Sequence, residues 1–126
     1  MLLTYITGKR HRKTCERVLE WFKSQYLPRH HLDISVIHRS LKEDGVVGWC
    51  MVEGSTSRPR SFLIEIDSQL KGKDYPKTLL HELWHVYQHV KGKPQCEEEA
   101  YKMENILLNN YLSLTKNYPE NLQKHN

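Results

Sequence analysis

The sequence predicts an α+β domain in which one helix precedes a three-stranded, mainly antiparallel sheet and two further helices follow it. Three observations support this prediction. Apolar residues near the N-terminus recur at helical spacing up to a proline, three short segments then alternate as strands do, and two amphipathic helical patterns follow around a Gly-Lys-Pro turn. A length of 126 residues with 38% hydrophobic residues suits a single domain, residues 1–126, with one core.

The first predicted helix covers residues 12–27. Pro28 ends it, because proline lacks the amide hydrogen that a helix uses and its ring fits poorly inside one. The apolar face of this helix consists of Val18, Leu19, Trp21, Phe22 and Tyr26.

Three predicted strands follow, at residues 32–38, 46–52 and 61–67. Each is rich in β-branched or aromatic side chains, which favour an extended backbone. Turn-forming residues precede the later two strands, at Glu43-Asp44-Gly45 and at Pro59.

Two helices complete the predicted fold. The first covers residues 74–91, because Pro76 is typical of a first helical turn and Gly92 of a helix end. The second covers residues 95–114. The polar residues 116–126 are expected to form a frayed tail.

The run His81-Glu82-Leu83-Trp84-His85 is the most informative motif of the chain. Positions i and i+4 of a helix point within about 40° of each other, so both imidazoles can bind one Zn²⁺. Glu82 lies about 100° around the helix from His81, where it can act as the general base that takes a proton from a metal-bound water. An ordinary amphipathic helix with surface histidines has the same spacing, but it needs no third ligand.

A catalytic zinc site uses three protein ligands and leaves one position for water. Glu97 lies on the apolar stripe of the last predicted helix together with Ala100, whereas Glu98 and Glu99 point toward solvent. A carboxylate on an apolar stripe is costly to bury unless it has a partner such as a metal ion. We therefore expect Glu97 to be the third ligand, with Cys96 or another of these glutamates as the alternative.

The pattern His81-Glu82-x-x-His85, followed by Glu97-x-x-Ala100 on the next helix, resembles the gluzincin branch of the zinc metallopeptidases. It is most similar to compact bacterial and phage forms, the SprT-like and ImmA/IrrE-type peptidases.

The resemblance covers residues 61–114 and implies a zincin-like minimal domain that hydrolyses peptide bonds in a peptide or protein substrate. In this family, three side chains hold zinc and the acid of the motif is base and proton shuttle. The family's strand before the metal helix, here residues 61–67, binds an extended peptide along its edge. The corresponding residues of this chain are His81, His85 and Glu97 for zinc and Glu82 for the base.

The chain departs from this family in three respects. Thermolysin has Asn and Asp where this chain has Cys96 and Tyr101, the connection from His85 to Glu97 is short, and the third histidine ligand of SprT proteins has no suitably spaced counterpart. These departures leave the subfamily open.

Further side chains are expected to assist at such a site. Glu104 is the candidate for orienting a ligand histidine, with a structural salt bridge as an equal alternative. Tyr101, Tyr87 and His89 are candidates for stabilising the oxyanion, and Trp84 is expected in the core.

The formal net charge is +4, and basic residues form clusters at 9–13 and 29–31. Such clusters permit binding to nucleic acid, although a solvated start of a helix is the interpretation that we favour. The alternative function is therefore a non-catalytic zinc-fold module that contacts nucleic acid or a protein through the basic N-terminal region. That module would not require Glu82.

The three cysteines, Cys15, Cys50 and Cys96, are odd in number and form no closely spaced pair, which favours reduced thiols. No stretch reaches the length of a membrane-spanning helix, and the N-terminus lacks the features of a secretory signal. We expect a cytoplasmic protein that contacts no membrane, in the host cytoplasm if it is encoded by a phage.

Overall fold

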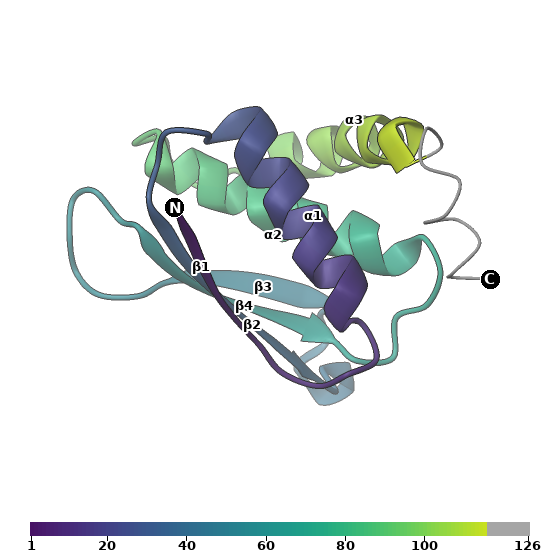
Figure 1. The fold of residues 1–126 in the computed structure, drawn as a ribbon. Coiled ribbons are helices and arrows are strands. Elements are labelled where there is room, and N and C mark those ends of the chain that lie inside the picture. The colour runs from purple at the N-terminus through teal and green to yellow at the C-terminus, as the bar shows by residue number, and fades with distance from the viewer. Residues whose placement is uncertain (116–126) are drawn as a thin grey trace.

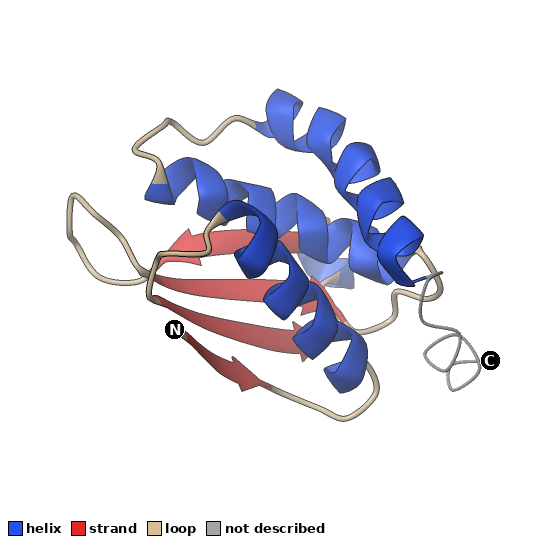
Figure 2. Ribbon diagram, turned by 45° about the horizontal axis from the view of Figure 1, so that its top comes forward, coloured by secondary structure: helices blue, strands red, loops and turns tan. Residues whose placement is uncertain are grey.

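The computed structural model describes residues 1–115 as a four-stranded sheet with three helices on one of its faces (Figure 1; Figure 2). The elements in chain order are β1 Leu2–Ile6, α1 Arg12–Tyr26, β2 Leu32–Arg39, a 3₁₀ helix Lys42–Asp44, β3 Gly48–Val52, β4 Ser61–Asp67, α2 Asp74–Val90 and α3 Glu97–Thr115. The α+β class is confirmed. The tail expected at residues 116–126 lies outside the described residues.

The sheet differs from the three-stranded, mainly antiparallel one that the sequence predicted. Its strand order is β1-β2-β4-β3, and only β3 and β4 pair in antiparallel fashion. β1 was missed because its side chains do not alternate between buried and exposed, and because β1 pairs in parallel with β2, which lies beyond a whole helix in the chain. Parallel neighbours need such a crossover connection, and α1 provides it.

The position of β4 also corrects an expectation. β4 is paired on both sides, with β2 and with β3, so its backbone offers no open edge to a peptide. Among the described strands, β3 takes the edge position next to β4. The sequence could not show this, because strand order depends on pairing between segments and not on the pattern within each one.

The core lies between the sheet and the helices. In β4, every second side chain is buried, as the period of a strand requires. These strand residues meet apolar side chains of α1 and α2 in one cluster, which includes Phe62, Ile64, Ile66, Val18, Leu19, Phe22, Leu79 and Leu83.

α2 is the central helix of this layer. It packs on β3 and β4 below it, α1 lies on one side, and α3 runs beside it on the other (Figure 1). Eleven of its 17 residues are buried, including His81, Glu82 and His85. The polar side chains of the motif are therefore held inside the fold.

Candidate metal centre

The structure brings the three predicted ligands together at the junction of α2 and α3. One ligand atom from each of His81, His85 and Glu97 lies within 4.8 Å of the others. The Nε2 atom of His81 lies 2.9 Å from Oε1 of Glu97, and the Nε2 atom of His85 lies 3.1 Å from the same oxygen. This grouping is the one that the sequence predicted.

Local sequence explains how these side chains meet. The two histidines are one helical turn apart on α2, so both rings face α3. Gly92, with φ of 72°, adopts the left-handed conformation that lets the chain turn back just after α2. α3 then begins at Glu97, so this carboxylate faces the histidines from the first turn of the neighbouring helix.

Hydrogen bonds at the other ring nitrogens determine which atoms are available for a metal ion. His81 Nδ1 lies 2.7 Å from Oε1 of Glu104, and His85 Nδ1 lies 2.8 Å from Oε1 of Gln88. A carboxylate and an amide oxygen accept hydrogen bonds, so both contacts favour a ring proton on Nδ1, and in that neutral tautomer each Nε2 presents a lone pair.

Two imidazole lone pairs and one carboxylate oxygen thus face the same small space. Lone pairs at such distances repel one another unless a cation lies among them. His85 is fully buried and His81 is 6% exposed, so water compensates this repulsion poorly. The donor set of two neutral imidazoles and one carboxylate therefore fits a divalent transition-metal ion.

The environment of Glu97 differs from the prediction. Its side chain is 59% exposed and does not lie on the buried stripe of α3. The helical wheel misplaced it because Glu97 is the first residue of its helix, and no preceding turn covers it. Ala100 is buried as expected, so the apolar stripe starts one turn later.

Glu98 and Glu99 were both predicted to point toward solvent, and only the prediction for Glu98 is confirmed. Glu98 is exposed, as predicted. Glu99, in contrast, does not simply point toward solvent, because its Oε1 accepts hydrogen bonds from Trp84 Nε1 at 2.7 Å and from Gln88 Nε2 at 3.0 Å. Cys96 is not part of the ligand group, and its Sγ accepts the backbone N–H of Glu99.

Glu82 lies beside the two histidines and is 4% exposed. Burial raises the pKa of this carboxyl to about 7, an electrostatic interaction with His81 opposes the shift, and the nearby Glu97 and Glu104 add to it. A carboxyl group that titrates near neutrality can both accept and return a proton. Gly48 of β3 makes room for Glu82, since a Cβ atom at position 48 would lie 3.2 Å from its Oε2.

A cleft of about 750 Å³ opens in front of this group. Its walls are α2, the first turns of α3, residues 45–50 and the segment around the 3₁₀ helix. The lining carries four carboxylates and one lysine, namely Asp67, Glu82, Glu97, Glu104 and Lys42. This volume lies within the range of ligand-binding clefts.

The three candidate oxyanion donors have different positions. Tyr101 lines the cleft, and its ring meets the ring of His81 edge-on with centroids 4.6 Å apart. Tyr87 stacks on Trp84 instead, and His89 contacts Gln95. Neither Tyr87 nor His89 lines the cleft, so Tyr101 alone of these three candidates lies where it can reach a bound substrate.

Glu104 makes both contacts that the sequence left open. Its Oε1 lies 2.7 Å from Nδ1 of His81, and its Oε2 pairs with Lys77 Nζ at 3.4 Å. Sequence reasoning missed Gln88 and Gly48. The only available signal for Gln88 was its spacing, three residues after His85 on the same helix.

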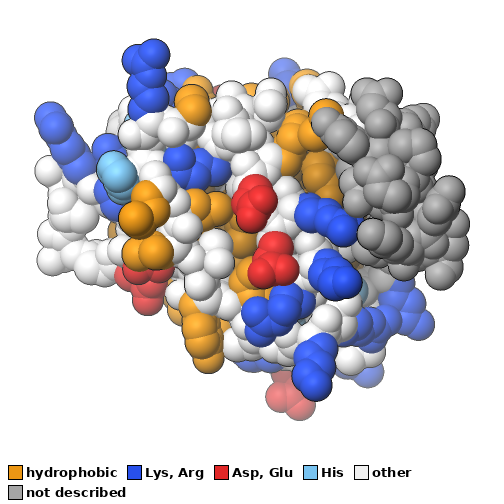
Figure 3. All heavy atoms as spheres, in the orientation of Figure 1, with side chains coloured by type: hydrophobic (Ala, Val, Ile, Leu, Met, Phe, Trp, Pro, Cys, Tyr) orange, Lys and Arg blue, Asp and Glu red, His pale blue; other side chains and the backbone are white. Residues whose placement is uncertain are grey.

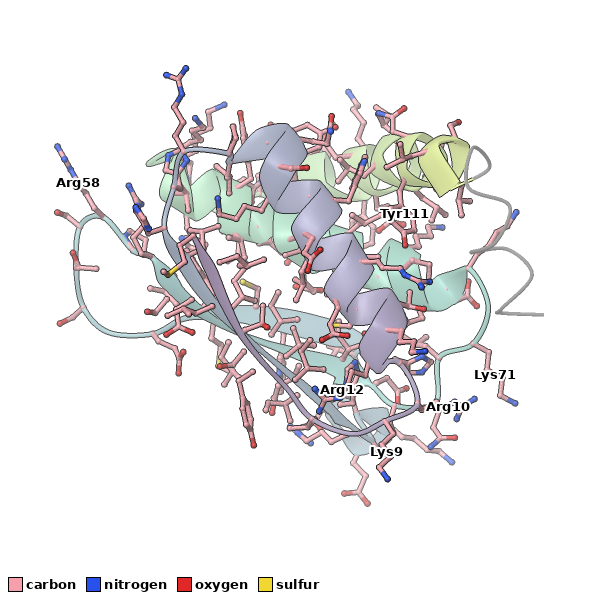
Figure 4. All side chains as sticks on the ribbon, in the orientation of Figure 1. Lys9, Arg10, Arg12, Arg58, Lys71 and Tyr111 are labelled. Atoms are coloured by element: carbon pink, nitrogen blue, oxygen red, sulfur yellow. The ribbon has the colours of Figure 1, made fainter. Side chains whose placement is uncertain are left out.

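The basic cluster at residues 9–13 lies apart from this cleft, and none of its members lines the cleft. Arg12 donates to the backbone carbonyls of Ile6 and Gly8, which secures the start of α1. Figure 3 shows Lys and Arg side chains gathered at the lower right of the view, where Figure 4 labels Arg10 and Lys71. Lys9, Arg10, Arg12 and Lys13 are exposed there, and the binding of this cluster to nucleic acid stays a prediction.

The three cysteines are unpaired. Within residues 1–115, no helix combines the length and the apolar character needed to cross a membrane. Comparison of the chain with protein-family models, with curated proteins and with solved structures found no significant match.

Proposed function

We propose that this chain is a zinc-dependent metallopeptidase with a zincin-like minimal fold. The observation that carries the proposal is the convergence of His81, His85 and Glu97 within 4.8 Å, beside the buried carboxyl of Glu82. Metal-binding side chains alone would make a structural site. A buried acid next to them, at the inner wall of a cleft, supports catalysis.

Zinc is the metal that this donor set favours. Two imidazoles and one carboxylate are the ligands of known catalytic zinc sites, and three protein ligands leave a position open. A bound Zn²⁺ would lower the pKa of a coordinated water and polarise the carbonyl group of a substrate.

The residues of the chain supply the remaining chemistry. Glu82, with its pKa near 7, takes a proton from the attacking water and returns it to the leaving amine. Tyr101 lines the cleft with its ring against His81, and in the proposed mechanism its hydroxyl donates a hydrogen bond to the developing oxyanion.

The edge strand β3 gives the cleft a wall suited to an extended peptide. Residues 48–50 of this strand line the cleft, and β3 pairs with β4 on one side only. An edge strand can hydrogen-bond an added strand through its backbone, which binds a peptide with little dependence on its sequence. We therefore propose β3, and not β4, as the strand that binds the substrate.

The alternative function, a non-catalytic zinc-fold module, has less support. A binding module needs no buried carboxyl beside the ligands, and the basic cluster that would contact nucleic acid does not face the cleft.

Metal analysis and hydrolysis assays on three proteins test the proposal. The wild-type chain is expected to bind one zinc ion and to cleave quenched-fluorescent peptides of mixed sequence. Glu82→Gln should keep the zinc and lose about 10²-fold to 10⁴-fold of the rate, because it cannot accept the proton. His81→Ala should lose both the zinc and the activity.

Three results would contradict the proposal. A wild-type chain that takes up no zinc would remove the metal centre. A zinc-loaded chain that cleaves no peptide, or a Glu82→Gln variant with full activity, would leave the metal centre but remove the peptidase mechanism.

A further inference from the structure

Gln88 is a buried amide with an unusual number of partners. It is 1% exposed, and its side chain takes part in four hydrogen bonds. Its Oε1 lies 2.8 Å from His85 Nδ1 and accepts the backbone N–H of Cys96 at 3.2 Å. Its Nε2 donates to the Cys96 carbonyl at 3.1 Å and to Glu99 Oε1 at 3.0 Å.

These partners determine the orientation of the amide. The Nε2 atom has two acceptors before it, so the other atom is an oxygen, and an oxygen can only accept the proton of His85 Nδ1. Gln88 therefore selects the tautomer in which Nε2 of His85 keeps its lone pair toward the metal position.

The same amide also holds the start of α3. Both backbone groups of Cys96 bond to Gln88, and so does the side chain of Glu99, which Trp84 Nε1 contacts as well. Glu97 lies between these two attachment points. The Glu97 side chain is largely exposed, so these backbone contacts, together with the histidines, decide where its carboxylate lies.

We propose that Gln88 is a positioning residue that couples two ligands of the metal centre, by orienting His85 and placing the backbone that carries Glu97. The proposal rests on the proposed metal centre, because its consequence is a change in metal affinity. Loss of the amide would disturb one ligand on each helix at the same time.

The first test compares Gln88→Met with wild type and with Leu83→Met as the matched control. Methionine is close to glutamine in size but has no amide, and Leu83 is a fully buried residue of the same helix. We expect Gln88→Met to bind zinc about 10-fold to 100-fold more weakly in chelator competition, the range typical for loss of a partner of a ligand histidine. Leu83→Met should bind zinc like wild type.

The visible spectrum of the cobalt-substituted protein provides a readout of ligand geometry. We expect Gln88→Met to shift the absorption bands, because His85 is no longer oriented, whereas the control keeps the wild-type spectrum. Equal zinc affinity and equal spectra for Gln88→Met and wild type would overturn the proposal. Zinc binding by the wild type is measured in the same experiment. It distinguishes a failure of the Gln88 proposal from a failure of the proposed metal centre.

A rescue variant separates positioning from simple packing. Gln88→Glu places a carboxylate against that of Glu99 and should weaken zinc binding. Adding Glu99→Gln allows the side-chain amide at position 99 to donate to the carboxylate at position 88, which is the reverse of the wild-type hydrogen bond. We therefore expect part of the zinc affinity to return. An absence of any recovery in the well-folded double variant would count against the coupling.

Amide exchange tests the contact with α3 without any metal. In the chelator-treated wild type, the Cys96 N–H is bonded to Gln88 and should exchange slowly. Gln88→Met should exchange this amide faster, whereas Leu83→Met should not. Identical exchange at Cys96 in all three proteins would overturn the role of Gln88 in holding α3.

Discussion

At the scale of single residues, Glu97 and Glu98 are adjacent carboxylates with different surroundings. Glu97 Oε1 lies 2.9 Å from Nε2 of His81 and 3.1 Å from Nε2 of His85, whereas Glu98 is exposed and belongs to no candidate ligand group among the described residues. Replacing each of the two carboxylates by an amide gives a matched test of the third ligand, because the chemical change is the same and only the position differs.

We predict that Glu97→Gln weakens zinc binding by at least about 10-fold, because a neutral amide oxygen is a poorer ligand than a carboxylate. Glu98→Gln should bind zinc as the wild type does. Isothermal titration with zinc measures both affinities. Equal affinities for the two variants would mean that the third ligand is another residue.

Gly48 is a second residue with a testable role, because side chains of α2 lie close to its backbone. A Cβ atom there would lie 3.1 Å from Thr78 Cγ2 and 3.2 Å from Glu82 Oε2, so a side chain must push one of them aside. We predict that Gly48→Ala lowers peptide hydrolysis by up to about 100-fold while zinc content stays unchanged, because it displaces the base and not the ligands.

The control for this prediction is Met51→Ala, an exposed residue of the same strand that does not line the cleft. It should retain the wild-type rate. A Gly48→Ala protein with full activity would show that Glu82 has room to move.

At the scale of elements, a cluster of aromatic and polar side chains ties α2 to the rest of the fold. His38, near the end of β2, lies 2.9 Å from the Thr7 carbonyl through Nδ1 and 2.6 Å from the Tyr75 hydroxyl through Nε2. His11 stacks on Tyr75 with ring centroids 4.0 Å apart. Three segments are thus joined at the first turn of the helix that carries His81 and His85.

This cluster predicts a loss of stability in mild acid. Burial is the main cause that lowers the pKa of His38 below 6.5, and Arg12 lowers it further, although the Thr7 carbonyl opposes the shift. Burial also lowers the pKa of His11, with the charges of His38 and Arg10 adding to it. Because the unfolded chain binds these protons more readily, stability is greatest above the unfolded pKa of 6.5 and falls as the pH drops through it.

We predict that His38→Gln unfolds more easily than wild type at about pH 7.5, by about 1 kcal/mol, because it loses a hydrogen bond. Its free energy of unfolding should fall less between about pH 7.5 and about pH 5.5 than that of wild type. Denaturant titrations in chelator at both pH values measure this difference. Parallel pH dependence in the two proteins would contradict the assignment to His38.

At the scale of the whole molecule, the proposed metal centre would add a link between α2 and α3, which already meet through packing and through side-chain hydrogen bonds. An ion bound only by the folded protein stabilises it by mass action, by about 2.7 kcal/mol when free zinc is about 100 times the dissociation constant. We predict that zinc raises the midpoint of thermal unfolding by several degrees, and that a chelator reverses the shift.

Glu97→Gln provides the control at this scale, since it should lose most of the zinc-dependent shift and leave the metal-free midpoint nearly unchanged. Differential scanning fluorimetry records both. A zinc response of the same size in this variant would point to binding elsewhere on the chain.

Strong local patterns allowed much of the architecture to be predicted. The strand at 61–67 has the expected bounds, and α1 and α2 end within one residue of their predicted ends. His81, His85 and Glu82 were identifiable because helical geometry alone determines their relative positions. These features depend on contacts between residues that are near in sequence.

The helices, the main strands and the His-Glu-x-x-His motif follow from the amino-acid sequence, because each depends on a period that can be counted along the chain. The strand order of the mixed sheet, the edge position of β3, and the contacts of Glu99 and Gln88 between α2 and α3 follow only from the folded structure. The physical reason is that these features are pairings between distant segments, and their free energy depends on which surfaces meet when the chain folds.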